Sequence, residues 1–226
     1  MIDTKINTKI NTGRYSQLSA LLDYPEEGFV EKIRDIQLYL DEHEPDCGAV
    51  LNGFSEFVTT LSLDEIQELH TRSFDVQAIT TLDLGYLLFG DDYKRAELLV
   101  NLSREHTLTG NDCGYELADH LPNVIRLLSK LNDEALKDEL VKKLICPGLK
   151  KMIREFDPEN LAKKNEVYQR HHKTLIDMPV HYGTIYQKPL YVLLALLRDD
   201  FGVEDLKDDK ASGFLGAIGN EMNIEG

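Results

Sequence analysis

Cysteine is scarce in this sequence, and its few residues follow neither a disulfide nor a metal pattern. The chain has three cysteines, an odd number, at the widely spaced positions Cys47, Cys113 and Cys146, and none of them belongs to a C-x-x-C pair. A disulfide framework would need an even, closely spaced set, and a zinc site would need paired ligands. Reduced thiols of this kind are typical of a cytoplasmic protein.

Long apolar runs are also missing. The longest, Tyr191 to Leu197, is far shorter than the roughly 20 residues that a membrane-spanning helix requires. Residues 1–13 form a short polar repeat without the hydrophobic core of a signal peptide. We therefore expect a cytoplasmic protein with no stable membrane insertion.

Basic residues are outnumbered, with 25 Lys and Arg against 40 Asp and Glu, which gives a formal net charge of -15. Most of such a surface repels a phosphate backbone, so nucleic acid is not an expected partner. A basic peptide or a basic protein patch would be attracted instead. A generally solvated acidic surface explains the same charge equally well.

Residues that favour β-sheets are few relative to those that favour helices. The chain has 35 Leu but 11 Val, and straight-chain residues prefer helices whereas β-branched residues prefer sheets. With 226 residues the chain is long enough to bury a core in one domain. We expect an all-α protein, a single globular helical bundle over residues 14–206, with flexible tails at 1–13 and 207–226.

Apolar spacing and helix signals place the individual helices. One stripe is Phe29, Ile33, Ile36 and Leu40, and a second is Leu51, Phe54, Val58 and Leu61. A capping-box pattern opens a helix at Ser62 and Glu65. We also expect a short helix from Arg14 to Tyr24 stopped by Pro25, and a further helix that is broken or kinked around Pro147-Gly148. The chain is expected to restart at Asp157-Pro158, and a last helix to run from Tyr186 to Phe201.

Recognisable catalytic motifs are absent from the sequence. It contains no G-x-S-x-G, no glycine-rich phosphate loop with Lys, no H-E-x-x-H and no Glu-x-x-His pair of the di-iron type. His171 and His172 are adjacent, so on a helix they point about 100° apart and cannot readily share one ion. We predict a protein that is not an enzyme and needs no metal or cofactor, with a metal-dependent enzyme as the weaker alternative.

The most informative stretch runs from Phe89 to Leu131. A helix that begins after Asp92 places one stripe on a single face, made of Arg95, Leu98, Leu99, Leu102 and His106. After a break at residues 109–114 comes the string Glu116-Leu117-Ala118-Asp119-His120-Leu121-Pro122, and Pro122 is tolerable in the first turn of the next helix. Asp119 is expected near that N-terminus, where a carboxylate is favoured.

This string resembles the E-L-P-D-H-L-P motif of the helical maturation chaperones of respiratory molybdoenzymes, in particular the nitrate reductase delta-subunit (NarJ) type, related to the TorD and DmsD chaperones. Leu21 to Pro25 resembles the early L-L-x-Y-P of that family, and residues 70–75 resemble its Y-T-x-x-F-D segment. The order and spacing agree over roughly residues 15–131. The chain departs from the family pattern at Ala118 for Pro, Ala96 for Gly and His70 for Tyr.

The resemblance implies a cytoplasmic, non-catalytic chaperone in nitrate reductase assembly, present as a monomer or a weak dimer. Its partner would be the N-terminal peptide of a molybdopterin-containing catalytic subunit, held during molybdenum cofactor insertion. The expected peptide-binding residues are Glu116, Asp119, His120, Pro122, Leu98, Leu99, Leu102, Phe74, Asp75 and Tyr86.

Each of these residue types has an expected part in binding. The carboxylates would pair with partner Arg or Lys, and the leucines would line a groove for an apolar helical face. His120 would either orient Asp119 or make the site sensitive to pH near neutrality. Arg95 is expected to organise the site by binding a carboxylate, Asp91 or Asp119. A generic helical adaptor for another basic partner remains the alternative.

Overall fold

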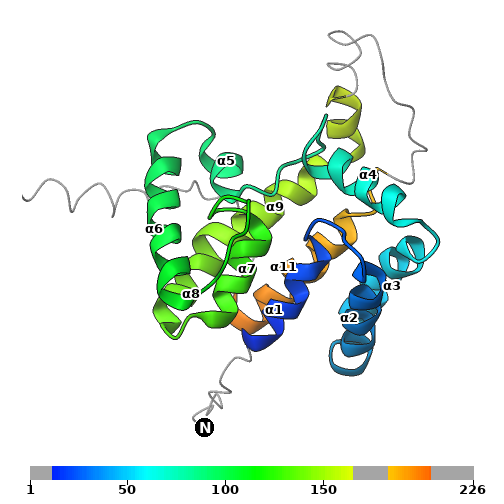
Figure 1. The fold of residues 1–226 in the computed structure, drawn as a ribbon, viewed down its shortest axis with the longest axis horizontal. Helices are drawn as coiled ribbons and strands as arrows, with labels where there is room; N and C mark the ends of the chain where they lie inside the picture. The colour runs from blue at the N-terminus through cyan, green and yellow to red at the C-terminus, as the bar shows by residue number, and fades with distance from the viewer. Residues whose placement is uncertain (1–11, 165–182, 205–226) are drawn as a thin grey trace, which may run out of the picture.

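Every named element of the protein is a helix in the computed structural model, which describes residues 12–164 and 183–204 (Figure 1). In chain order these elements are η1 (Thr12–Arg14), α1 (Tyr15–Leu18), η2 (Ser19–Leu21), α2 (Phe29–His43), α3 (Pro45–Val58), α4 (Leu63–Phe74), α5 (Leu84–Phe89), α6 (Tyr93–Thr109), α7 (Leu121–Lys130), α8 (Glu134–Glu139), the π-helical turn η3 (Leu140–Ile145), α9 (Cys146–Glu155) and α11 (Gln187–Phe201). Residues 158–164 are helical as well. The prediction of an all-α bundle is confirmed.

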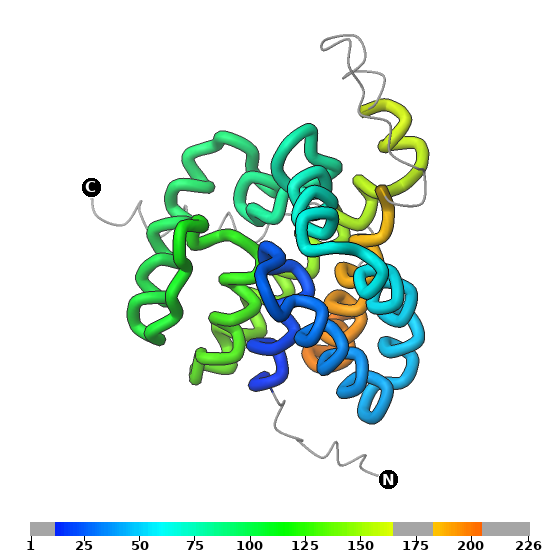
Figure 2. Tube along the Cα trace, turned by 45° about the vertical axis from the view of Figure 1, so that its right-hand side comes forward, coloured from blue at the N-terminus to red at the C-terminus, as the bar shows by residue number. Residues whose placement is uncertain are grey.

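One continuous apolar core joins these helices, and α11 runs through its middle. Leu190, Leu193 and Leu197 of α11 are fully buried. The helix packs against both α3 and α9, so it connects the group formed by α2, α3 and α4 with the group formed by α7, α8 and α9 (Figure 1). In the turned view of Figure 2, α11, in orange, again lies beside α3. The predicted last helix is confirmed, with Tyr186 preceding its first turn.

The two predicted apolar stripes form the inner faces of α2 and α3. All four residues of the first stripe are buried, and so are Leu51, Phe54 and Val58 of the second. Leu61 lies beyond the end of α3 and is partly buried against the core. The two helices form a hairpin joined at Glu44, because Pro45 is tolerated at the first position of a new helix.

The capping box at the start of α4 is confirmed. The Ser62 hydroxyl accepts from the Glu65 backbone N–H at 3.4 Å, and the Ser62 N–H donates to the Glu65 carboxylate at 2.8 Å. Two N–H groups that have no partner inside the helix are thereby satisfied. The backbone hydrogen bond also lowers the pKa of Glu65 below its ordinary value.

The first predicted helix is shorter and less regular than expected. It consists of η1, α1 and η2 and ends at Leu21, instead of continuing to Tyr24. Backbone bonds from Leu22 and Asp23 both return to the Ser19 carbonyl, which tightens the last turn. Because the ring of Pro25 disfavours helical geometry before it, the chain leaves the helix ahead of the proline.

The helix that we expected to be broken or kinked around Pro147-Gly148 is not broken there. Helix α8 continues through η3 into α9, with Pro147 in the first turn of α9. Proline has no N–H to donate, and its ring crowds the carbonyl four residues earlier. The wider π-helical turn immediately before Pro147 relieves that crowding without interrupting the helix.

A cluster of charged side chains fastens the start of the described chain to α11. Arg14 binds Glu44 at 2.5 Å and Asp200 at 2.9 Å, and the Tyr15 hydroxyl donates to Asp200 at 2.6 Å. Burial and the bond to Asp200 raise the pKa of Tyr15 above its ordinary value, so the hydroxyl keeps the proton that it donates.

Several predictions fall on residues that the structure does not describe. These are the pair His171-His172, residues 1–11 of the predicted N-terminal tail and the predicted tail at 207–226. Across residues 12–164 and 183–204, no helix combines the length and apolar character needed to cross a membrane.

Candidate functional site

The motif string covers the end of the connection between α6 and α7 and the first two residues of α7, and its backbone is bonded to the start of α5. Asp83 and His120 form an isolated antiparallel β-bridge. On either side of it, the Leu84 N–H donates to the Asp119 carbonyl at 3.0 Å and the Leu121 N–H donates to the Leu82 carbonyl at 2.8 Å. Two segments more than 30 residues apart in the chain are therefore joined through their backbones.

Asp119 is completely buried and holds the N-terminus of α5. Its side-chain Oδ2 accepts from the Gly85 N–H at 3.0 Å and from the Arg95 Nε at 3.2 Å. Its carbonyl accepts from Leu84, so two N–H groups of the first turn of α5 are satisfied by one residue. The Asp119 Oδ1 atom has no hydrogen-bond partner among the described residues.

The predicted position of Asp119 near the N-terminus of α7 is correct, but the helix whose amides it accepts from is different. The N-cap residue of α7 is His120, which makes no side-chain capping bond. Because the β-bridge turns the Asp119 side chain toward α5, its carboxylate meets the amides of a helix that is distant in sequence.

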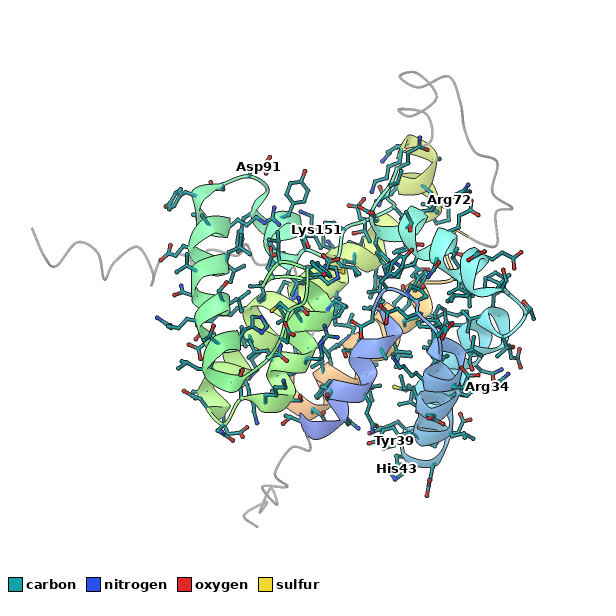
Figure 3. All side chains as sticks on the ribbon, viewed as in Figure 1. Arg34, Tyr39, His43, Arg72, Asp91 and Lys151 are labelled. Atoms are coloured by element: carbon teal, nitrogen blue, oxygen red, sulfur yellow. The ribbon has the colours of Figure 1, made fainter. Side chains whose placement is uncertain are left out.

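Arg95 organises the site, as predicted, and it does so through two carboxylates. Its Nε binds the Asp119 Oδ2 at 3.2 Å, and its Nη2 binds the Asp83 Oδ2 at 2.9 Å. Its guanidinium carbon lies 5.2 Å from the centre of the Tyr86 ring, within cation–π range. Of the two carboxylates expected for Arg95, Asp119 is a partner, whereas Asp91 lies at the outer tip of the α5–α6 turn (Figure 3).

Asp83 is the site residue that the sequence analysis missed. It is the N-cap residue of α5, and an acidic residue directly before an apolar helix is a recognised start signal. His120 Nδ1 lies 3.3 Å from the Asp83 Oδ1, and this hydrogen bond, reinforced by the charge of Arg95, lowers the pKa of Asp83. Asp83 therefore carries its negative charge at neutral pH.

His120 faces Asp83 and Glu116, and not Asp119 as predicted. Its Nδ1 is 3.8 Å from the Glu116 Oε2. The two side chains meet although residues 116–120 are not helical. Glu116 is exposed and stands at the outer end of a row of contacts that continues through His120, Asp83 and Arg95 to Tyr86.

Two glycines allow α5 to approach its neighbours closely. A Cβ at Gly85 would lie 2.6 Å from the Asp119 Oδ2, so a side chain there would displace the carboxylate. A Cβ at Gly148 of α9 would lie 2.3 Å from Leu84 Cδ2. At the other end of α5, Lys151 of α9 donates to the Leu87 carbonyl at 2.5 Å (Figure 3). Helix α5 is thus fixed at both ends.

A second hydrogen-bond cluster fixes the loop that carries the motif. Asn111 donates to the Nδ1 of His106, so the ring proton is on Nε2, which donates to the Ala118 carbonyl at 2.9 Å. Asn123 donates to the Leu117 carbonyl at 3.0 Å. Burial lowers the pKa of His106, which keeps this ring neutral. His106 is a structural residue of the loop.

The predicted peptide-binding residues divide into accessible and inaccessible ones. Glu116, Tyr86 and Asp75 are exposed, and Leu98, Leu99 and His120 are partly exposed. Asp119, Pro122, Leu102 and Phe74 are buried. The four buried residues present no surface to a partner in this structure, because the core and the Arg95 network already cover them.

Phe74 belongs to a different part of the core. Its ring packs against His70, Tyr186 and Phe156, at centroid distances of 5.0, 5.0 and 6.4 Å. Burial lowers the pKa of His70 to about 4, so this aromatic cluster contains a neutral imidazole. Asp75 follows at the end of α4. Neither residue joins the row from Glu116 to Tyr86.

In the described part of the chain, no group of three His, Cys, Asp or Glu residues is arranged to hold a metal ion. Comparisons with known proteins return neither a matching family model nor a matching curated protein.

Proposed function

We propose that this protein is a maturation chaperone that binds the N-terminal segment of a molybdenum-containing oxidoreductase subunit, and that it assists cofactor insertion and subunit assembly. The observation that carries the proposal is the surface formed by the motif and the α5–α6 pair. There the carboxylates of Glu116 and Asp83 lie in one row of contacts with the exposed Tyr86 ring.

This surface has the two components that a basic amphipathic segment requires. Leu98 and Leu99 of α6 are partly exposed, and a Cβ at Gly85 would lie 3.1 Å from Leu98, which places that leucine beside α5. An apolar helical face can pack on such leucines while its Arg or Lys pairs with a partly desolvated carboxylate. Tyr86 offers a ring face for apolar contact or for a cation.

The net charge of -15 favours the same class of partner, because a basic segment is attracted to the protein before contact. The resemblance of residues 116–122 to the chaperone motif adds the molybdoenzyme as the partner and nitrate reductase as the first enzyme to test. A generic adaptor would use the same surface for another basic protein. The two are separated by which N-terminal peptides bind.

The test is a calorimetric titration of the full chain with an N-terminal peptide of a nitrate reductase catalytic subunit. Tyr86→Ala removes a central aromatic contact and is expected to weaken binding about tenfold. Glu116→Gln removes one exposed charge and is expected to weaken it about twofold to fivefold. Glu42→Gln, which changes an exposed carboxylate on α2, is the matched control and should bind unchanged.

Salt provides a second readout, since pairing with exposed carboxylates weakens as ionic strength rises. Peptide binding that is insensitive to both variants would place the contact elsewhere on the protein. Absence of binding to molybdoenzyme peptides, together with binding to an unrelated basic peptide, would replace the chaperone with the adaptor.

A further inference from the structure

The outer face of helix α6, which the described part of the protein leaves uncovered, carries three exposed apolar side chains with Glu97 and Arg104 between them. Tyr93, Val100 and Leu108 are 74%, 69% and 73% exposed. At 100° per residue these three side chains fall within an arc of about 80°. The opposite side of α6 holds its two buried residues, Leu102 and His106, and its main contacts, with α5 and α7. Figure 1 shows α6 at the edge of the molecule.

The charge of α6 differs from that of the chain as a whole. The helix contains three basic residues and two acidic ones, which gives +1 with His neutral, against -15 for the full sequence. Two copies of the protein repel one another over most of their surfaces. That repulsion is weaker where the two α6 helices face each other than over the acidic parts of the surface.

The outer face of α6 is also complementary to itself. In an antiparallel pair centred between Val100 and Asn101, Tyr93 lies opposite Leu108 of the second copy. In the same register Glu97 lies opposite Arg104 of the second copy. The Arg104 side chain is 65% exposed and forms an ion pair with the neighbouring Glu105 in its own chain. The two Val100 side chains meet beside the two-fold axis. Each contact occurs twice, as an isologous interface requires.

We propose that α6 is a self-association surface that pairs antiparallel with α6 of a second copy of this chain. A single helix pair buries less than the roughly 1,200–2,000 Å² of a stable interface, so the dimer is weak and forms as the concentration rises. The row from Glu116 to Tyr86 is not part of this interface. The self-association therefore does not depend on the proposed function.

Sedimentation velocity of the full chain over a range of micromolar concentrations tests the proposal. The weight-average mass should rise from that of a monomer of 25.8 kDa toward twice that value. Val100→Asp puts two carboxylates together at the axis and should raise the dimer dissociation constant at least about tenfold. Leu38→Asp, at a position 67% exposed on α2, is the control and should leave the dissociation constant unchanged.

Charge reversal tests the register itself. Glu97→Arg and Arg104→Glu should each weaken the dimer by placing like charges opposite one another, and the double variant should restore it. A monomer at every concentration, a dimer unaffected by Val100→Asp, or a double variant no better than the single ones would overturn the proposal. Loss of client-peptide affinity in Val100→Asp without any change in mass would assign the face to the client, and would also overturn it.

Discussion

Arg95→Met removes the guanidinium that reaches the buried carboxylate of Asp119. The Asp119 side chain is 0% exposed. In the variant its carboxylate would still accept a hydrogen bond from the Gly85 N–H. Removing one partner of a buried ion pair costs about 3–5 kcal/mol, because the other charge is left without compensation. The bond to Asp83 adds little to this, since Asp83 is partly solvated.

The expected loss is a large part of the total stability of a domain, which is about 5–15 kcal/mol. Urea unfolding followed by far-ultraviolet circular dichroism measures it directly. The double variant Arg95→Met/Asp119→Ala should be at least about 2 kcal/mol more stable than Arg95→Met alone, because it no longer buries an unpaired charge. Asp83→Asn, as a control, should cost less than about 1 kcal/mol.

A cost below about 1 kcal/mol for Arg95→Met would show that Arg95 is not what compensates the buried charge of Asp119, and that some other group does so. A double variant less stable than Arg95→Met would also count against this pairing, since the two side chains would be contributing independently.

Two further predictions concern the support of the site and its pH response. Gly148→Ala places a Cβ against Leu84, which should lower the free energy of unfolding in urea by about 1–3 kcal/mol and weaken peptide binding. If neither the free energy of unfolding nor the peptide affinity changed, α5 would be able to shift without cost. The pKa of His70 is about 4 in the folded protein against 6.5 when unfolded, so the protein loses stability as the pH falls from 6.5 toward 4, by up to about 3.5 kcal/mol. Urea midpoints across this range should fall less steeply in His70→Leu, and equal slopes would contradict the assignment.

The sequence predicts those parts of the fold that depend on neighbours in the chain. The stripe from Phe29 to Leu40 and the capping box at Ser62 are local patterns, and both occur as expected. The π-helical turn before Pro147 does not follow from a local rule, because the proline signal alone indicates a break.

For the site, the sequence identifies the segment but not its contacts. Arg95 and Asp119 are paired, yet the helix amides that Asp119 accepts from belong to α5, and Asp83 is recruited through a β-bridge to His120. These partners are 34 and 37 residues apart in the chain, and no periodic pattern connects them. Burial of Asp119 likewise depends on tertiary packing, so a motif residue expected at the surface becomes a structural one.

Hydrogen–deuterium exchange of the full chain, with and without the N-terminal peptide of the catalytic subunit, would show whether the peptide binds at the surface formed by the motif and the α5–α6 pair. Added peptide should slow exchange in residues 84–99 and 113–120, around the row from Glu116 to Tyr86, and should leave the α2–α3 hairpin unchanged. Protection confined to α2 and α3, or no protection at peptide concentrations that saturate binding, would contradict binding at this surface.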